Sequence, residues 1–195
     1  MSALTFDEAA HEYRLDGRRL PSVTQLLAPL VDYSKVQRET LERAQALGTA
    51  VHRMTELYDN DDLDEESLSD ELRPYLASWL RFRTECQFEP VTIEHRMSHP
   101  LYRYAGTSDR TGIIKGRLAV VDLKKMMVLG PHIGPQLAAY EKLHQAEGLK
   151  VLDRFALGLR PDGTYRLQPY TDPLDWQCFL SHLTIHNWKT KHEHH

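Results

Sequence analysis

The sequence has few cysteines and no long apolar run. Its 195 residues include two cysteines, Cys86 and Cys178, too few for a disulfide framework or for the four thiolates of an iron–sulfur cluster. No apolar run approaches the roughly 18 residues of a membrane-spanning helix. The N-terminus lacks the basic and then apolar order of a secretory signal. These absences predict a cytoplasmic protein with no iron–sulfur cluster and no membrane contact.

The sequence also lacks an excess of basic charge. It has 24 Lys and Arg against 28 Asp and Glu, a formal net charge of −4, so a nucleic-acid partner would need a local basic patch. No P-loop, zinc-finger or helix-turn-helix signature appears. Apolar residues make up 41% and charged residues 27%, which is an ordinary balance for a globular chain. This length and composition predict one domain over residues 1–195.

The first half of the chain is expected to be helical. Ser22 is a candidate N-cap, and Gln25, three residues later, completes a capping box. The alternative function for this helix start is to hold a phosphate. A long helix is expected from Lys35 to about Tyr58, and another over 70–86, because apolar residues recur at helical spacing in both.

The second half alternates strands and helices. The expected strands are 91–97, 102–114 and 117–124, the last two joined by a tight turn at Gly116. A helix from near Pro135 to Gly148, a hairpin and a final helix follow. Together, N-terminal helices over 20–86, a sheet and helix over 90–148 and a closing hairpin and helix over 150–190 predict an α/β (α+β) fold. Its centre would be a mixed sheet flanked by helices.

Charged residues interrupt the predicted central hairpin. Side chains alternate along a strand, so Asp122 and Lys124 share one face. Asp109 on the partner strand is expected to lie near Asp122, and two adjacent carboxylates repel unless a divalent cation such as Mg²⁺ or Mn²⁺ lies between them. The alternative is a structural ion pair between Asp122 and Lys124 at the strand end. The spacing alone leaves both interpretations open.

Five short motifs occur in an order that resembles the PD-(D/E)xK nuclease superfamily. They are LPSVTQLL, GTAVH, GTSD, VVDLK and QLAAY, spread over roughly residues 20–145. Within that superfamily, the QLAAY motif resembles the RecB-like branch of phage-type exonucleases. The resemblance implies a restriction-endonuclease-like fold and a Mg²⁺- or Mn²⁺-dependent deoxyribonuclease.

The resemblance also implies roles for residues at the hairpin. Asp109 and Asp122 would be catalytic metal ligands, with the backbone carbonyl of Leu123 as an additional ligand. Lys124 would be the catalytic lysine. His52, from GTAVH, would complete the metal site from the helix side, although a histidine beside an apolar stripe is also compatible with a core position.

Three further polar residues have two interpretations each. Glu94 is either a metal-site acid or a surface residue on an alternating strand. Gln136 and Tyr140 share a helical face. They would support the active site and contact DNA, or be a polar residue of the first helical turn and a core tyrosine.

The expected substrate is DNA, bound without sequence reading and through linear ends. Basic residues near the cleft would contact its backbone, and Ser22 would assist at its helix start. The function implied is exonuclease action in phage-type recombination or DNA processing inside a phage-infected or bacterial cell. A single-strand annealing protein is the expected partner, and oligomers are compatible with the sequence. The alternative is a nuclease-fold module that binds DNA or protein without cleavage. The basic residues expected at the backbone are Arg53, Arg96, Arg110, Lys124 and Lys125.

Overall fold

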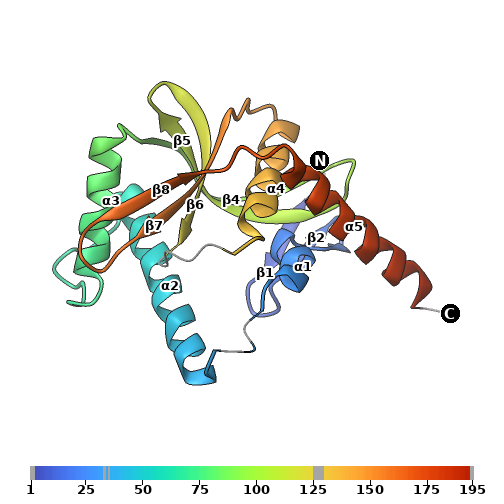
Figure 1. Ribbon diagram of the computed structural model, residues 1–195, viewed down its shortest axis with the longest axis horizontal. Coiled ribbons are helices and arrows are strands. Elements are labelled where there is room, and N and C mark those ends of the chain that lie inside the picture. Colours follow the sequence, from blue (N-terminus) through green and yellow to red (C-terminus); the bar gives the residue numbers. More distant parts are fainter. Residues whose placement is uncertain (1–2, 33, 35, 125–129, 194–195) are drawn as a thin grey trace.

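The structure is a computed structural model that describes residues 3–32, 34, 36–124 and 130–193 (Figure 1). Its main sheet has five strands, which are Glu89–Ser98 (β4), Ala105–Ile114 (β5), Arg117–Lys124 (β6), Asp153–Leu159 (β7) and Tyr165–Pro169 (β8). The strands lie in the order β4-β5-β6-β7-β8. Only the β6–β7 pair is parallel among these neighbours. The predicted mixed sheet is confirmed.

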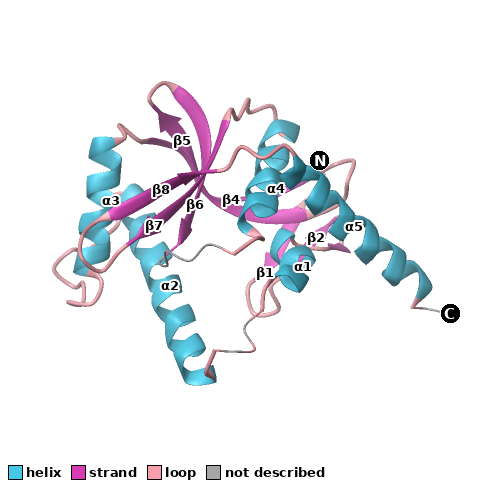
Figure 2. Ribbon diagram, in the orientation of Figure 1, coloured by secondary structure: helices cyan, strands magenta, loops and turns pink. Residues whose placement is uncertain are grey.

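Helices cover both faces of this sheet (Figure 2). One apolar cluster joins the sheet to Arg38–Asp59 (α2) and Arg73–Glu85 (α3). The other joins it to Ile133–Ala146 (α4), against which Val23–Leu27 (α1) and Leu174–His192 (α5) pack. Helix α4 connects β6 to β7, because parallel neighbours need a crossover. No helix in the described residues is both long and apolar enough to cross a membrane.

Strand β6 is buried on both faces, and its alternation decides where its charged residues point. Val120 belongs to the cluster under α4, whereas Val121 and Leu123 belong to the cluster under α2 and α3. Asp122 therefore shares the α4 side with Val120, and Lys124 follows on the same side.

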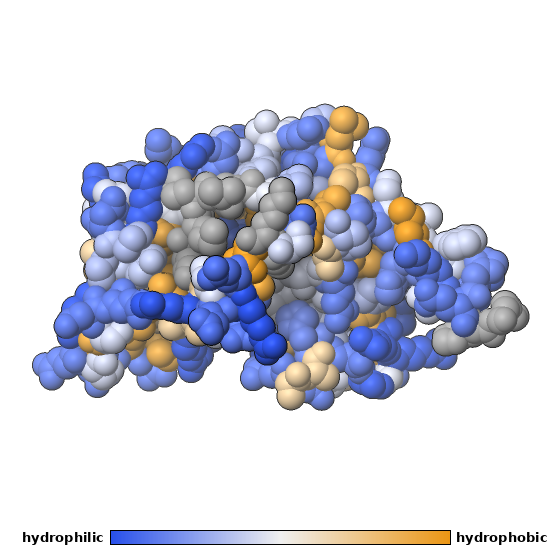
Figure 3. Space-filling model, turned by 60° about the horizontal axis from the view of Figure 1, so that its bottom comes forward, coloured by the Kyte–Doolittle hydropathy of each residue, from blue (hydrophilic) through white to orange (hydrophobic). Residues whose placement is uncertain are grey.

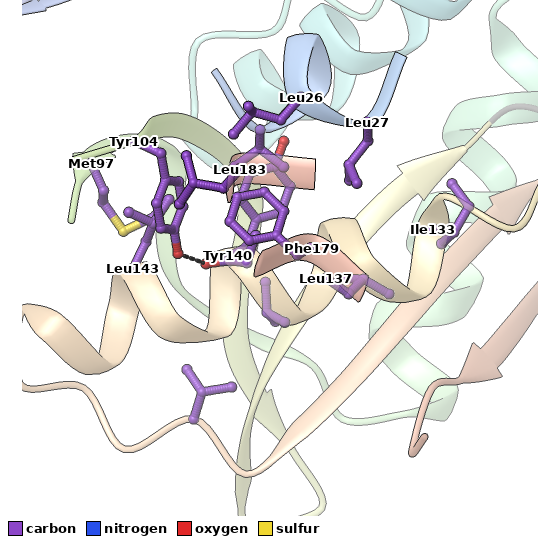
Figure 4. Close-up of a cluster of buried hydrophobic side chains, with 14 of the residues drawn as sticks. Leu26, Leu27, Met97, Tyr104, Ile133, Leu137, Tyr140, Leu143, Phe179 and Leu183 are labelled. Carbon is purple, nitrogen blue, oxygen red and sulfur yellow. Dashed lines mark hydrogen bonds between the residues drawn. The ribbon is translucent and has the colours of Figure 1, made fainter. Parts of the chain in front are cut away.

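The α4 side of the core is rich in aromatic rings (Figure 4). Tyr104 and Phe179 are both fully buried, and their ring centroids lie 4.7 Å apart. The Tyr104 hydroxyl donates a hydrogen bond of 2.9 Å to the carbonyl of Ala139 (Figure 4). This bond satisfies a buried polar group and fixes α4 against the chain that enters β5.

The turns agree with the predictions from sequence. Lys115 and Gly116 join β5 to β6 with φ of 49° and 78°, the left-handed pair that a two-residue hairpin turn requires. Gly163, in the predicted β7–β8 turn, has φ of 77°. Ser22 caps α1 with the complete capping box, so that prediction is confirmed.

A second sheet, which was not predicted from the sequence, lies near the N-terminus. Its strands are Leu4–Asp7 (β1), Glu12–Leu15 (β2) and Arg18–Leu20 (β3). Strands of three or four residues are too short for a period-2 pattern to be distinguished from a loop. Strand β5 also begins at Ala105 rather than at the expected residue 102, because Arg103 turns back to donate its N–H to the carbonyl of His99.

Candidate metal centre and active site

Three carboxylates lie in one row across three neighbouring strands. Ile93 pairs with Arg110 and His95 pairs with Ser108, so Glu94 on β4 lies opposite Asp109 on β5. Arg110 pairs with Val121, and one further step along this register sets Asp109 opposite Asp122 on β6. The hairpin spacing therefore brings the two aspartates together as the sequence analysis expected. Glu94 joins them from the next strand.

Glu94 has an unusual backbone for a strand residue. Its φ is 45°, a left-handed conformation that costs a non-glycine residue about 1–3 kcal/mol and is concentrated at functional sites. Its Oε1 lies 3.9 Å from Nδ1 of His52 and 3.2 Å from Nη1 of Arg110. The backbone thus gives up regular strand geometry where the Glu94 carboxylate turns toward His52.

Asp109 is held in place by the backbone of the next strand. Its Oδ2 accepts a hydrogen bond of 2.7 Å from the N–H of Leu123. Its Oδ1 lies 3.6 Å from Nδ1 of His52. One oxygen is therefore fixed by the sheet, and the other faces the histidine.

His52 reaches the same point from α2. Its Nε2 lies 3.1 Å from the carbonyl oxygen of Leu123, and a carbonyl only accepts, so Nε2 carries the proton. In the neutral ring Nδ1 would then carry the lone pair and face Asp109 and Glu94, which is the tautomer that a metal ligand needs. The Leu123 carbonyl, expected as a ligand itself, is the acceptor that orients this ring.

The residues around Nδ1 of His52 suit a divalent cation. One donor atom from each of His52, Glu94 and Asp109 lies within 4.8 Å of the other two. Burial, and then the neighbouring Asp109, raise the pKa of Glu94 to about 7. A cation would relieve the repulsion between the Glu94 and Asp109 carboxylates. Oxygen donors with one imidazole nitrogen are compatible with Mg²⁺ or Mn²⁺.

Asp122 is 1% exposed and has two partners of its own. Its Oδ2 lies 2.8 Å from Nζ of Lys124, and its Oδ1 accepts a bond of 2.9 Å from Nε2 of Gln136. Burial raises the pKa of Asp122, while Lys124 opposes that rise. The Asp122–Lys124 ion pair left open by the sequence is present, next to the cation site.

Gln136 and Tyr140 come from the first turns of α4. The Gln136 amide that binds Asp122 also lies 3.3 Å from the Tyr140 hydroxyl. Tyr140 in turn packs over Gly106 of the GTSD motif, where a Cβ atom would lie 2.9 Å from Cε1 of the tyrosine. Glycine at this position therefore allows α4 to approach β5 closely enough for Gln136 to reach Asp122.

A cleft of about 720 Å³ is lined by Glu94, Asp109, Asp122 and Lys124 together with Gln136 and Tyr140. Its walls come from the N-terminal sheet, the start of α1, α2 and the main sheet. Its two arginines each form an ion pair with an acidic lining residue, Arg53 with Glu56 at 2.8 Å and Arg96 with Glu8 at 3.0 Å. The lining includes Tyr13, Ser22, Arg53, Glu94, Arg96, Asp109, Asp122, Lys124, Gln136 and Tyr140.

The basic residues expected at a DNA backbone have different environments. Arg53 and Arg96 line the cleft with side chains 60% and 49% exposed. Ser22 also lines it, but its hydroxyl accepts the Gln25 N–H as the helix cap. Lys125 lies outside the described residues.

The expected DNA contact by Arg110 is wrong. Its side chain is 0% exposed and bonds to Asp59, Glu94 and Thr55. The physical reason is the buried Asp59 carboxylate on α2, which accepts a hydrogen bond of 2.7 Å from Nε of Arg110 and draws its side chain into the core. Arg110 belongs to the support of the site, where it holds Glu94.

Asp59, which anchors that support, was not predicted from the sequence. Its carboxylate is 0% exposed and accepts hydrogen bonds from Arg110, Arg83 and Trp79 at 2.7, 3.0 and 3.1 Å. Asp59 follows Val51 and Thr55 at four-residue spacing, which is the buried stripe of α2. An acid on an apolar stripe was the available signal.

Comparisons with known proteins give no family. No protein-family model matches the chain, and no curated protein matches it significantly. Among solved structures, a candidate exonuclease from Eubacterium rectale has a TM-score of 0.47 at 15% identity, covering 71% of this chain and 64% of its own. A structure described as SSO0001 has a TM-score of 0.37 at 18% identity, covering 60% and 62%.

An alkaline exonuclease from Laribacter hongkongensis has a TM-score of 0.43 at 10% identity and covers 88% of this chain and 91% of its own. This chain spans less than two thirds of the first two structures. All three TM-scores lie below 0.5, and none of these likenesses by itself establishes an activity.

Proposed function

We propose that this protein is a metal-dependent DNA nuclease that hydrolyses phosphodiester bonds, and that it acts as an exonuclease in phage-type recombination or DNA processing. One observation carries the proposal. Donor atoms of His52, Glu94 and Asp109 lie within 4.8 Å of one another, and Glu94 and Asp109 line the same cleft as the Asp122–Lys124 pair.

His52, Glu94 and Asp109 would hold Mg²⁺ or Mn²⁺, with Asp122 and the Leu123 carbonyl beside them. When bound, such a cation lowers the pKa of a water molecule and offsets the charge of a phosphate. The chain orients these ligands through neighbouring groups. The Leu123 N–H holds Asp109, and the Leu123 carbonyl holds His52.

Lys124 is the group that would act on the reacting atoms. Its ammonium is fixed near the carboxylates by Asp122, which Gln136 holds from the other side. A positive charge at that point would orient the attacking water and stabilise the charge that develops on the phosphate. The ion pair is thus compatible with a catalytic role, because it positions the lysine.

Arg53 and Arg96 would contact the DNA backbone at the rim of the cleft. Both are exposed there, and guanidinium groups bind phosphate oxygens without distinguishing bases. The acidic residues of the cleft would repel DNA in the absence of a cation. Cation binding and substrate binding should therefore support each other.

The test is incubation with end-labelled linear DNA and with closed circular DNA in Mg²⁺, Mn²⁺ or EDTA. We expect linear DNA to be degraded from its ends with either cation and to remain intact in EDTA. Degradation in excess EDTA would contradict the metal requirement. Equal cleavage of closed circles would show an endonuclease, and binding without cleavage would favour the silent nuclease-fold module.

A further inference from the structure

A second cavity, of about 470 Å³, is lined at the start of α1 by Pro21 and Gln25, next in sequence to residues that line the catalytic cleft. Strand β3, the chain before β5 and the C-terminal half of α5 contribute its lining. Arginines provide most of its charge, and no described lining residue is acidic. The polar lining groups that matter here are Arg18, Arg19, Gln25, Arg103, His186 and Asn187.

Few carboxylates neutralise the positive charge of the arginines in this cavity. Arg19 forms an ion pair of 3.0 Å with Glu12. Arg18 and Arg103 have no ion pair within the described part of the chain. Concentrated positive charge is notable in a chain of net charge −4. Like charges repel, so a bound anion would stabilise this arrangement.

Arg103 is an exposed residue whose backbone is fixed where it lines the cavity. Its φ is 57°, and its N–H donates a bond of 3.0 Å to the carbonyl of His99. The next residue, Tyr104, is fully buried. The planar fork of a guanidinium matches the oxygens of a phosphate.

The two cavities share one wall. Ser22 and Thr24 line the catalytic cleft, whereas Pro21 and Gln25 line the second cavity. A nucleic-acid strand that crosses this short wall would place one phosphate near Lys124 and another near Arg18 and Arg103.

We propose that the second cavity binds a backbone phosphate of the nucleic-acid substrate, away from the bond that is cleaved. This inference rests on the proposed function for the identity of the ligand. It adds a binding site formed by β3, the loop before β5 and α5, and it makes binding depend on the length of the substrate.

The test compares the double variant Arg18→Gln/Arg103→Gln with wild type and with a matched control, Lys115→Gln/Lys150→Gln. The control removes the same charge at exposed positions near the other end of the sheet. Binding of a fluorescent 20-nucleotide DNA is measured in Ca²⁺ at several salt concentrations, with the DNA checked for integrity. Hydrolysis of bis(p-nitrophenyl) phosphate, which is too small to span the wall, is measured in Mn²⁺.

We expect the double variant to bind the oligonucleotide roughly tenfold more weakly, with a salt slope smaller by up to about 1.4–1.8 for two lost phosphate contacts. Hydrolysis of the small diester should stay within about twofold of wild type. An affinity loss equal to that of the control would overturn the inference. Failure of wild type to cleave either substrate would contradict the proposed function, while the binding comparison would still decide the role of the cavity.

Discussion

The two aspartates of the central hairpin have different environments despite lying opposite each other. Asp109 has one oxygen fixed by the Leu123 N–H and the other directed at His52. Asp122 is occupied by Lys124 and Gln136. Asp109 therefore has the geometry of a cation ligand, and Asp122 has the geometry of a group that positions the lysine.

This division predicts that metal binding and cleavage separate at Lys124. Replacing Asp109 by Asn removes a negatively charged ligand. Because one electrostatic contact is lost, Mn²⁺ affinity and cleavage should fall together, each by about tenfold or more. Replacing Lys124 by Met removes a nearby positive charge, so Mn²⁺ affinity should hold or rise. Cleavage should still fall by about a hundredfold or more. Calorimetric titration with Mn²⁺ beside a nuclease assay measures both effects.

Lys115→Met, at the exposed β5–β6 turn, is the control for loss of a lysine. If Lys124→Met cleaves DNA at the wild-type rate, Lys124 has only a structural role. Unchanged Mn²⁺ affinity in Asp109→Asn would place the cation elsewhere.

The sequence predicted some residues of the site better than others. Asp109, Asp122 and Lys124 lie on one hairpin, so alternation and spacing suffice to bring them together. Glu94 was left with two interpretations because its orientation depends on a left-handed backbone that no periodic pattern encodes. Arg110 was wrongly placed at the DNA because its partner Asp59 is 51 residues away in sequence.

At the scale of elements, Asp59 connects α2 to α3 and β5. Its hydrogen-bond partners Trp79 and Arg83 lie on α3, and Arg110 lies on β5. Because Arg110 also contacts Glu94, the packing of α2, α3 and β5 helps to position a residue of the candidate cation site.

Asp59→Asn should destabilise the protein strongly. The substitution leaves the buried Arg110 guanidinium without its closest carboxylate, and breaking a buried pair costs about 3–5 kcal/mol. Urea denaturation should show a lower midpoint with an unchanged slope. Asp62→Asn, at an exposed position just after α2, should have little effect. A similar midpoint for both variants would show that the Asp59 network does not support the fold.

A second link between elements predicts a pH dependence. His144 on α4 is fully buried, and its Nε2 lies 2.8 Å from the Ser108 hydroxyl on β5. The ring of His95 stacks on it at 5.9 Å, and His95 itself contacts Glu147. Burial, and then His95, lower the pKa of His144 from 6.5 to about 4.

The folded state therefore favours neutral His144, so its contribution to stability is complete above pH 6.5 and is lost as the pH falls toward 4. His144→Gln keeps a polar partner for Ser108 and cannot be protonated. Its free energy of unfolding should decrease less steeply than that of wild type between pH 6.5 and 4. His192→Gln, at an exposed position at the end of α5, should keep the wild-type slope. Equal slopes for wild type and His144→Gln would exclude this histidine as the source.

The elements themselves were predictable where they are long. The α2 stripe, the hairpin turned at Gly116 and the crossover helix all follow from periodicity and turn residues. The N-terminal sheet was not predictable, because its strands have four residues or fewer and are stabilised by contacts far away in sequence. One such contact is the bond of 2.7 Å between the hydroxyls of Tyr13 and Thr107.

At the scale of the whole molecule, the candidate cation site forms only when distant segments are folded together. His52 comes from α2, Glu94 from β4 and Asp109 from β5. The face shown in Figure 3 is mostly hydrophilic, with apolar residues in small separate groups. Charge and its compensation, more than apolar surface, therefore distinguish the regions proposed above as binding sites.

Because the unfolded chain cannot present these three donors together, a cation that binds them should stabilise the fold. At a concentration a hundred times its Kd, such a ligand contributes about 2.7 kcal/mol. For a protein of this size that corresponds to a rise in Tm of about 5–10 °C. Thermal unfolding followed by circular dichroism in Mn²⁺ and in EDTA measures the rise. Asp109→Asn should show none of it, whereas Lys124→Met should retain it because the ligands remain. A full rise in Asp109→Asn would mean that the stabilising cation binds outside this row of carboxylates, and the nuclease proposal would lose the site on which it rests.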